Sequence, residues 1–107
     1  MNKVKFGLLA RFEAGPGKEK AVESFLKDAL SLAEEEEEMI SWYAFRIGPS
    51  TFGIFDTFNN EEDRQAHLSA KIAKALMEQA GELLAGSPSI EEIELLAVKD
   101  GKIAIYK

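Results

Sequence analysis

The residues best suited to chemistry lie between Trp42 and His67. His67 is the only histidine of the chain, and imidazole is the side chain best suited to proton transfer near neutral pH. Arg46 and Asp56 are charged residues in or at the end of otherwise apolar stretches. Because charges are rarely buried without a partner, both form structural ion pairs, line a pocket mouth or point to solvent. His67 is thus the first candidate for a proton-transfer role.

Aromatic residues gather in the same stretch and offer a second kind of chemistry. They can stack on a planar aromatic ligand, although aromatic residues in strands more often pack in a core or an interface. The set consists of Trp42, Tyr43, Phe52, Phe55 and Phe58.

Other chemistries are poorly represented. There are no cysteines, which excludes disulfides, thiolate metal sites and cysteine nucleophiles. Gly15-Pro16-Gly17 lacks the pattern of a phosphate-binding loop, and one histidine with dispersed carboxylates is a poor metal site. The net charge is −6 and the 13 Lys and Arg residues are scattered, so nucleic acid is not an expected partner. We expect no metal, flavin or nicotinamide cofactor.

Two strands and a turn should position these residues. Apolar runs over Ile40–Ile47 and Thr51–Phe58 flank Gly48-Pro49-Ser50, which favours a hairpin. With Pro49 and Ser50 at the centre of the turn, one face pairs Tyr43, Phe45 and Ile47 with Asp56, Ile54 and Phe52. The other face then pairs Trp42, Ala44 and Arg46 with Thr57, Phe55 and Gly53.

The orientation of His67 depends on the helix that follows. The pattern predicts a helix from Glu61 to about Ala85, with a possible break at Ser69. A continuous helix would place His67 outside the apolar arc and in water, at about 100° per residue. A break at Ser69 would let the first segment rotate and direct His67 inward.

The rest of the chain completes the pattern. Residues Val4–Glu13 alternate as a strand, and Val22, Phe25, Leu26, Ala29 and Ala33 form the stripe of a first helix. The acidic run Glu34–Glu38 should end this helix and be solvated. A fourth strand covers Ile93–Ala97, and Asp100-Gly101 predicts a turn into a fifth strand, Lys102–Lys107.

The order β-α-β-β-α-β predicts a ferredoxin-like α+β fold with an antiparallel sheet, as one domain over residues 1–107. Bulky apolar residues on both faces of the sheet indicate that both are covered, one by the helices and the other by a second copy of the chain. No membrane-length segment or cleavage site is evident, so a cytoplasmic location is expected.

The stretch WYAFRIGPSTFGIFDTF followed by NNEEDRQAHL resembles the antibiotic biosynthesis monooxygenase family. The earlier stretch GLLARFEAGPGKE and the later stretch SPSIEEIELLAVK fit the same pattern, so the resemblance covers nearly the whole chain. It implies a dimeric α+β barrel in which two sheets face each other. Characterised members include monooxygenases that oxidise quinols or anthrones with molecular oxygen and without metal or flavin.

The resemblance therefore implies a small aromatic substrate in an apolar pocket between sheet and helices. His67 would be the base and Arg46 the anion stabiliser, with Trp42, Tyr43, Phe55 and Asp56 in contact with the substrate. Trp42 lies far from His67 in the sequence, which departs from the haem-degrading branch and does not support haem binding. The alternative function is a non-catalytic, small-ligand-binding or stress-related dimeric barrel.

Overall fold

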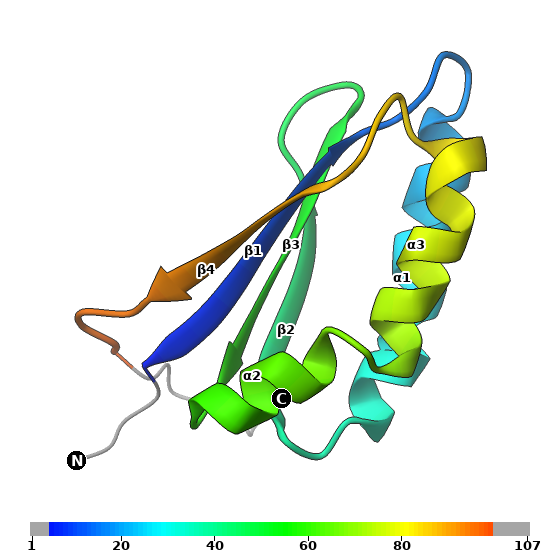
Figure 1. Ribbon diagram of the computed structural model, residues 1–107. Coiled ribbons are helices and arrows are strands. Elements are labelled where there is room, and N and C mark those ends of the chain that lie inside the picture. Colours follow the sequence, from blue (N-terminus) through cyan, green and yellow to red (C-terminus); the bar gives the residue numbers. More distant parts are fainter. Residues whose placement is uncertain (1–4, 100–107) are drawn as a thin grey trace, which may run out of the picture.

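The computed structural model describes residues 5–99 and has the ferredoxin-like βαββαβ arrangement (Figure 1). Two helices, α2 and α3, lie between β3 and β4, where the βαββαβ order has a single helix. The elements are β1 (Phe6–Glu13), α1 (Glu19–Glu35), β2 (Met39–Arg46), β3 (Thr51–Phe58), α2 (Glu61–His67), α3 (Lys71–Leu83) and β4 (Ser89–Glu94).

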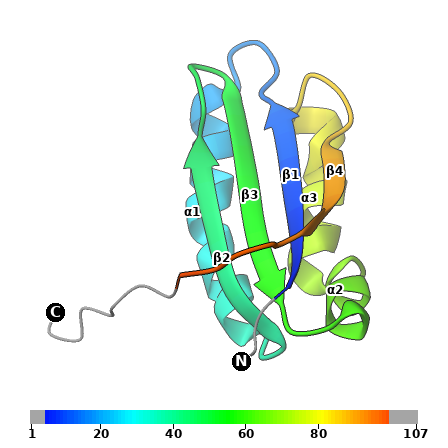
Figure 2. The same ribbon diagram turned by 90° about the vertical axis from the view of Figure 1, so that its left-hand side faces the viewer.

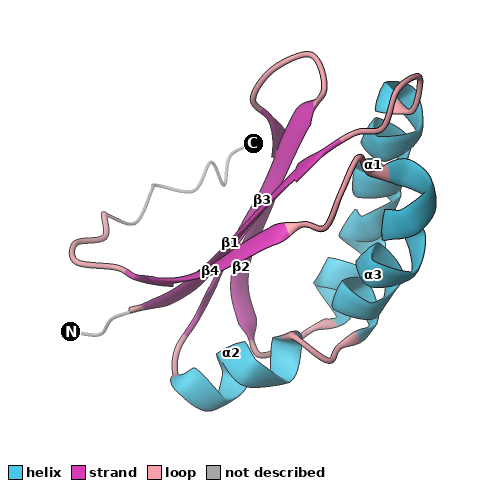
Figure 3. Cartoon of the chain, turned by 45° about the horizontal axis from the view of Figure 1, so that its top comes forward, coloured by secondary structure: helices cyan, strands magenta, loops and turns pink. Residues whose placement is uncertain are grey.

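The four strands form one antiparallel sheet in the order β2-β3-β1-β4. Helices α1 and α3 lie side by side over one face, and α2 lies at the end of the sheet where β3 finishes (Figures 1 and 3). The alternation predicted for β1 is confirmed, because Leu8 and Phe12 are buried towards the helices while Arg11 and Glu13 are exposed. The predicted turn at Asp100-Gly101 and the strand Lys102–Lys107 fall outside the described residues.

The predicted register of the β2–β3 hairpin is wrong by one residue. Trp42 pairs with Asp56, Ala44 with Ile54 and Arg46 with Phe52. The cause is the geometry of the connection over residues 47–50, in which the amides of Ile47 and Gly48 both donate to the carbonyl oxygen of Thr51. Since a shift of one residue changes the cross-strand partner of every side chain, Trp42 shares the helix-facing side with Asp56 rather than facing Thr57.

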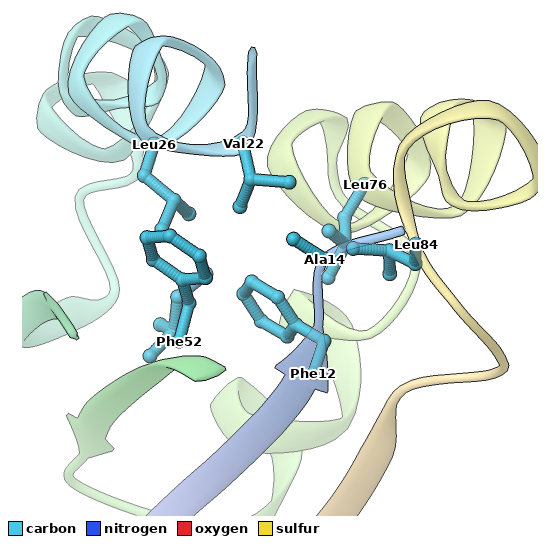
Figure 4. Packing of buried hydrophobic residues seen from close by; sticks show 8 residues of the cluster. Phe12, Ala14, Val22, Leu26, Phe52, Leu76 and Leu84 are labelled. Atoms are coloured by element: carbon cyan, nitrogen blue, oxygen red, sulfur yellow. The ribbon is translucent and has the colours of Figure 1, made fainter. Parts of the chain in front are cut away.

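The main core lies between β1, β3 and the two long helices (Figure 4). Phe12 and Phe52 project from the sheet, Val22 and Leu26 from α1, and Leu76 from α3. Burying each such side chain contributes about 1.5 to 3 kcal/mol. The stripe predicted for α1 is confirmed at Val22, Leu26, Ala29 and Ala33, which are all buried.

The break in the second helical region is confirmed at Ser69. Helix α2 ends at His67, and α3 begins at Lys71 after a short turn. The side chain of Asn60 caps α2 by accepting a hydrogen bond from the amide of Asp63 at 2.8 Å. The two helices therefore run in different directions (Figure 1), and α2 is free to direct His67 towards the sheet.

The acidic run behaves as predicted at most positions but not at Glu36. Helix α1 ends at Glu35, and Glu34, Glu35, Glu37 and Glu38 are exposed. The side chain of Glu36 turns inward and contacts His67, with 15% of its surface exposed. A hydrogen-bonding partner on another element thus removes this carboxylate from solvent.

The face of the sheet opposite the helices is open (Figure 2). Tyr43, Phe45 and Phe55 lie on this outer face. The rings of Phe55 and Phe45 cover Gly7 and Gly53, where an added Cβ would lie 3.1 and 2.5 Å from them. Residues 95–99 cross in front of this face (Figure 2).

Candidate functional site

A small cavity lies between the sheet and the helices α2 and α3. Its volume is about 40 Å³, enough for one or two water molecules or a diatomic gas. Nine of its lining side chains are apolar: Leu8, Ala10, Trp42, Ile54, Leu68, Ile72, Ala73, Leu76 and Ile90. The other two are Asp56 and His67. Leu68 and Ile90 are 39% and 45% exposed, so the lining reaches the surface at these two side chains.

His67 is held between two carboxylates. Its Nδ1 lies 2.7 Å from Oε1 of Glu36, and its Nε2 lies 3.1 Å from Oδ2 of Asp56. Its ring also packs on Phe58, with the ring centres 5.3 Å apart. Because only 9% of the His67 side chain is exposed, both ring nitrogens are turned away from water and towards these two acids.

The two acids determine the charge of His67. Burial is the largest single influence and lowers the pKa of His67, because it penalises the imidazolium ion. Hydrogen bonds and charge from Asp56, and then from Glu36, outweigh burial and raise the pKa above its usual value of 6.5. The folded protein therefore favours the imidazolium form, which donates from both nitrogens, more than the unfolded chain does.

Two buried polar atoms of residues that line the cavity have no hydrogen-bond partner within residues 5–99. One is Oδ1 of Asp56, the carboxylate oxygen that does not face His67, and the other is Nε1 of Trp42. Trp42 and Asp56 are directly opposite each other in the β2–β3 ladder. Since native proteins rarely leave buried polar atoms unpaired, this pair marks a place where a ligand or water is required.

A second hollow lies on the far side of His67, at the surface. Its lining includes Glu36, Glu38, Asp63 and His67, and its volume is about 200 Å³. His67 therefore separates the apolar cavity from an acidic depression, and Glu36 lies on the outer side.

The structure divides the site residues predicted from the sequence into three places. His67, Asp56 and Trp42 meet at the cavity. Trp42 also borders an open groove of about 550 Å³ between α1 and β2, which Tyr43 and Arg46 line. Phe55 lies on the outer face of the sheet and lines neither space.

Arg46 forms an ion pair in the groove rather than at the cavity. Its Nη2 lies 2.7 Å from Oε1 of Glu23, which also pairs with Lys27 at 2.9 Å. Lys27, together with Arg46, lowers the pKa of Glu23. The guanidinium of Arg46 also stacks over the ring of Phe52 at 4.8 Å. Its role as an anion stabiliser stays a prediction, and its position gives it no contact with the cavity.

Two residues of the site were missed by the sequence reasoning. Glu36 was hidden in a run of five acids, and nothing in the local pattern distinguishes it from its neighbours. Arg64 was passed over in the predicted helix, although its i, i+3 spacing to Glu61 and to His67 places all three on one side of a helix. That spacing was the available signal.

Arg64 fixes α2 to the sheet. Only 8% of its side chain is exposed, and it donates to the carbonyl oxygens of Gly7 and Ile93, each at 3.2 Å. It also pairs with Glu61 and, at 3.4 Å, with Glu92. The position of α2, and hence of His67, thus depends on a buried cation that binds β1 and β4.

Within residues 5–99, no group of three or more His, Cys, Asp or Glu residues has an arrangement that could hold a metal ion. None of the helices in that part of the chain combines the length and the apolar character needed to cross a membrane.

Comparison with solved structures gives a close match. A protein of unknown function from Nitrosomonas europaea is 49% identical, covers 92% of this chain and 96% of its own, and has a TM-score of 0.89. No family model matches the chain, and no curated protein does.

More distant structures share the fold. One from Nitrosomonas europaea, called a "putative antibiotic biosynthesis monooxygenase", is 10% identical over 90% of this chain and 94% of its own, with a TM-score of 0.76. One from Caulobacter crescentus with the same description is 18% identical over 89% and 92%, with a TM-score of 0.74.

Proposed function

We propose an oxygenase function for this chain, which belongs to the family of the 49% identical Nitrosomonas europaea protein and has the fold of the antibiotic biosynthesis monooxygenases. The substrate is a small aromatic compound of the quinol or anthrone type, and the oxidant is molecular oxygen without a bound cofactor. The observation that carries this proposal is that Asp56, which lines an apolar cavity, has an unpartnered, buried Oδ1.

Proton removal is the step that the site can perform. An anthrone carries a CH2 group between two aromatic rings, and loss of one proton leaves an electron-rich carbanion that reduces oxygen itself. The carbon then loses its second hydrogen, one oxygen atom becomes a carbonyl, and the other leaves as water. Asp56 accepts the first proton through Oδ1 and acts as a general base.

His67 provides a route for that proton to leave. The contacts of 3.1 Å to Asp56 and 2.7 Å to Glu36 form a continuous line from the cavity to the acidic depression. The relay uses the neutral form of His67: Nε2 accepts the proton from Asp56 while Nδ1 passes its own hydrogen to Glu36, which is the more exposed acid. In this arrangement His67 relays the proton and does not itself meet the substrate.

The size of the cavity limits how the substrate binds. A volume of about 40 Å³ admits the reacting edge of a ring or dioxygen, but not a tricyclic compound, since a cavity of about 150 Å³ is needed for benzene. The remainder of the substrate therefore lies at the mouth, against Leu68 and Ile90. An apolar lining also favours dioxygen and keeps water from the carbanion.

The alternative function is ligand binding without turnover. It is favoured by the same two contacts of His67, because a histidine bonded at both nitrogens also serves as a structural link. Under that alternative the Glu36–His67–Asp56 line holds α2 in place, and the cavity holds a ligand that is released unchanged.

Oxygen uptake separates the two functions. We expect the purified protein to consume oxygen with dithranol or a reduced quinone above the background of the uncatalysed reaction. Asp56→Asn removes the proton acceptor and should lower the rate at least about a hundredfold, the range typical of general-base catalysis. His67→Gln should lower it less, because Asp56 remains.

Asp28→Asn is the matched control, since Asp28 is an exposed acid on α1, and its rate should equal that of the unmodified protein. Arg46→Gln tests whether the groove between α1 and β2 takes part in the reaction. An unchanged rate of oxygen uptake in this variant would assign the reaction to the cavity alone. The oxygenase proposal fails if none of the substrates raises oxygen uptake, or if Asp56→Asn leaves the rate unchanged.

We also propose that two copies of the chain associate through the outer faces of their sheets. The open face carries the exposed ring of Tyr43 together with Phe45 and Phe55. Leu96 and Val98, in the segment that crosses this face, are 89% and 50% exposed. A partner sheet would cover all of these side chains, which supports a homodimer.

A further inference from the structure

The two unpartnered atoms beside the cavity differ in hydrogen-bonding character. Oδ1 of Asp56 accepts, and Nε1 of Trp42 donates. Both are shielded from solvent and lack a partner within residues 5–99. Because Nε1 is buried, water in the open groove that Trp42 also borders does not reach it. The two side chains both line the cavity and stand opposite each other on the same face of the sheet.

The charges around the cavity restrict what can satisfy both atoms. Asp56 and His67 are the ionisable side chains among the lining residues, and Glu36 contacts His67 from behind. Two carboxylates and one imidazole make up this group, so it is net negative whether or not the imidazole carries a second proton. Among residues 5–99, no lysine or arginine lines the cavity. An anionic ligand would therefore enter a low-dielectric space beside a negative charge, which is strongly unfavourable.

We propose that this pair binds the hydroxyl group of a neutral phenol or enol. The hydroxyl donates its hydrogen to Oδ1 of Asp56 and accepts from Nε1 of Trp42. The inference rests on the proposed function in that it names the part of the substrate that the same site recognises. Asp56 and Trp42 are then the specificity-determining residues, and carboxylates and phosphates are excluded.

The hydroxyl is the group that satisfies both atoms at once. An ether or ketone oxygen accepts from Trp42 but leaves Asp56 unpaired, and leaving a buried acceptor unpaired is unfavourable. A site built to bind a hydroxyl rejects the analogue without it for this reason. For the proposed reaction, this favours a quinol, or the enol form of an anthrone, whose hydroxyl proton passes to Oδ1 and leaves the same anion as loss of a CH2 proton from the keto form.

Binding of three simple compounds tests the proposal without turnover. Phenol, anisole and benzoate share one ring, but anisole cannot donate and benzoate is anionic. They are titrated under nitrogen while the emission of Trp42 is followed, because it is the only tryptophan of the chain. We expect phenol to bind about tenfold more tightly than anisole, and benzoate to bind more weakly than either.

Two variants assign this preference to the two side chains. In Asp56→Asn, the amide oxygen faces the N–H of His67 and the amide nitrogen faces the cavity, so the acceptor becomes a donor. The preference for phenol over anisole should disappear, whereas Asp28→Asn retains it. In Trp42→Phe, the affinities for phenol and for anisole should fall by a similar factor. Because this variant has no tryptophan, binding is followed by the ring proton signals of His67, the only histidine.

Equal binding of phenol and anisole by the unmodified protein would overturn the proposal, because the two atoms would then be satisfied by trapped water. Benzoate binding as tightly as phenol would also overturn it. The comparison of ligands on the unmodified protein needs no variant to fold. Selective binding of phenol without oxygen uptake would support this inference and contradict the oxygenase function, so the two failures are distinguishable.

Discussion

His67 links three elements through side-chain contacts. It is the last residue of α2, Glu36 follows the end of α1, and Asp56 belongs to β3. The same contacts that would carry a proton therefore also support the tertiary structure. A histidine with this double role should reveal itself in the pH dependence of stability as well as in any reaction.

The stability of the fold should fall as the pH rises above about 6.5. The folded protein raises the pKa of His67, so it binds a proton more tightly than the unfolded chain does. The stabilisation is fully present below the unfolded pKa of about 6.5 and is lost as the pH rises through the folded pKa. Urea denaturation at several pH values between 5.5 and 9, for the unmodified protein and His67→Gln, measures it.

The difference in unfolding free energy between the two proteins should be largest at the acidic end and shrink towards alkaline pH. Taking this difference cancels other groups that titrate in the same range. A difference that grows with pH would show that His67 is neutral in the folded protein. The ring signals of this single histidine give the pKa directly by NMR.

The sequence indicated His67 and Asp56 as candidate site residues, but it did not predict that their side chains are in contact. The contact between His67 and Asp56 depends on the direction that α2 takes after β3, which the break at Ser69 permits. The contact with Glu36 depends on how α1 ends against α2. Both contacts result from packing between elements that are distant in the sequence, and local periodicity carries no information about such packing. For this reason Glu36 was predicted to be solvated with the rest of the acidic run.

Helix α2 is short, at seven residues, and its position relies on contacts outside the helix. An isolated helix of this length has little stability of its own. Arg64 supplies stabilising contacts for this helix. It donates to carbonyl oxygens of β1 and β4 and forms ion pairs with Glu61 and Glu92. It is a positioning residue for His67, three positions further along the helix.

Replacing Arg64 should change the pKa of His67, although the two side chains have no hydrogen bond or ion pair with each other. Arg64→Met keeps the length and loses the charge and the donors, so we expect a loss of about 2 kcal/mol in unfolding free energy, the value of a buried charged hydrogen bond. The pKa of His67 should move towards 6.5 as α2 loosens. Chemical denaturation and NMR titration measure the two effects.

Glu62→Gln serves as the control, because Glu62 is an exposed residue of the same helix, and it should change neither quantity. Should Arg64→Met lower stability while the pKa of His67 stays constant, Arg64 would be structural only, with no part in placing the site.

The elements themselves followed from the sequence to a large extent. Alternation predicted β1, the apolar stripe predicted α1, and the break at Ser69 was among the alternatives for the second helical region. These succeeded because each depends on residues near one another in the chain. The register of β2 on β3 failed because Gly48-Pro49-Ser50 is compatible with more than one turn geometry.

The whole molecule has two unlike sides. Helices cover one face of the sheet, while the other carries aromatic rings and lies open (Figure 2). The prediction that both faces are covered came from bulky residues on both sides of the strands. The helix layer covers one face. A second copy of the chain stays the proposed cover for the other face, because the structure of one chain does not contain its partner.

Association through the outer face should depend on Tyr43. Its side chain is 59% exposed, so Tyr43→Lys costs the single chain little, but in a sheet-to-sheet dimer it would bury an unpaired charge. We expect light scattering to give about twice the 11.8 kDa chain mass for the unmodified protein and a single chain mass for Tyr43→Lys. Met77→Lys is the matched control, because Met77 is 55% exposed but lies on α3, on the opposite side of the molecule. Loss of the dimer in Met77→Lys with its retention in Tyr43→Lys would place the interface on the helices and leave the aromatic face without a partner.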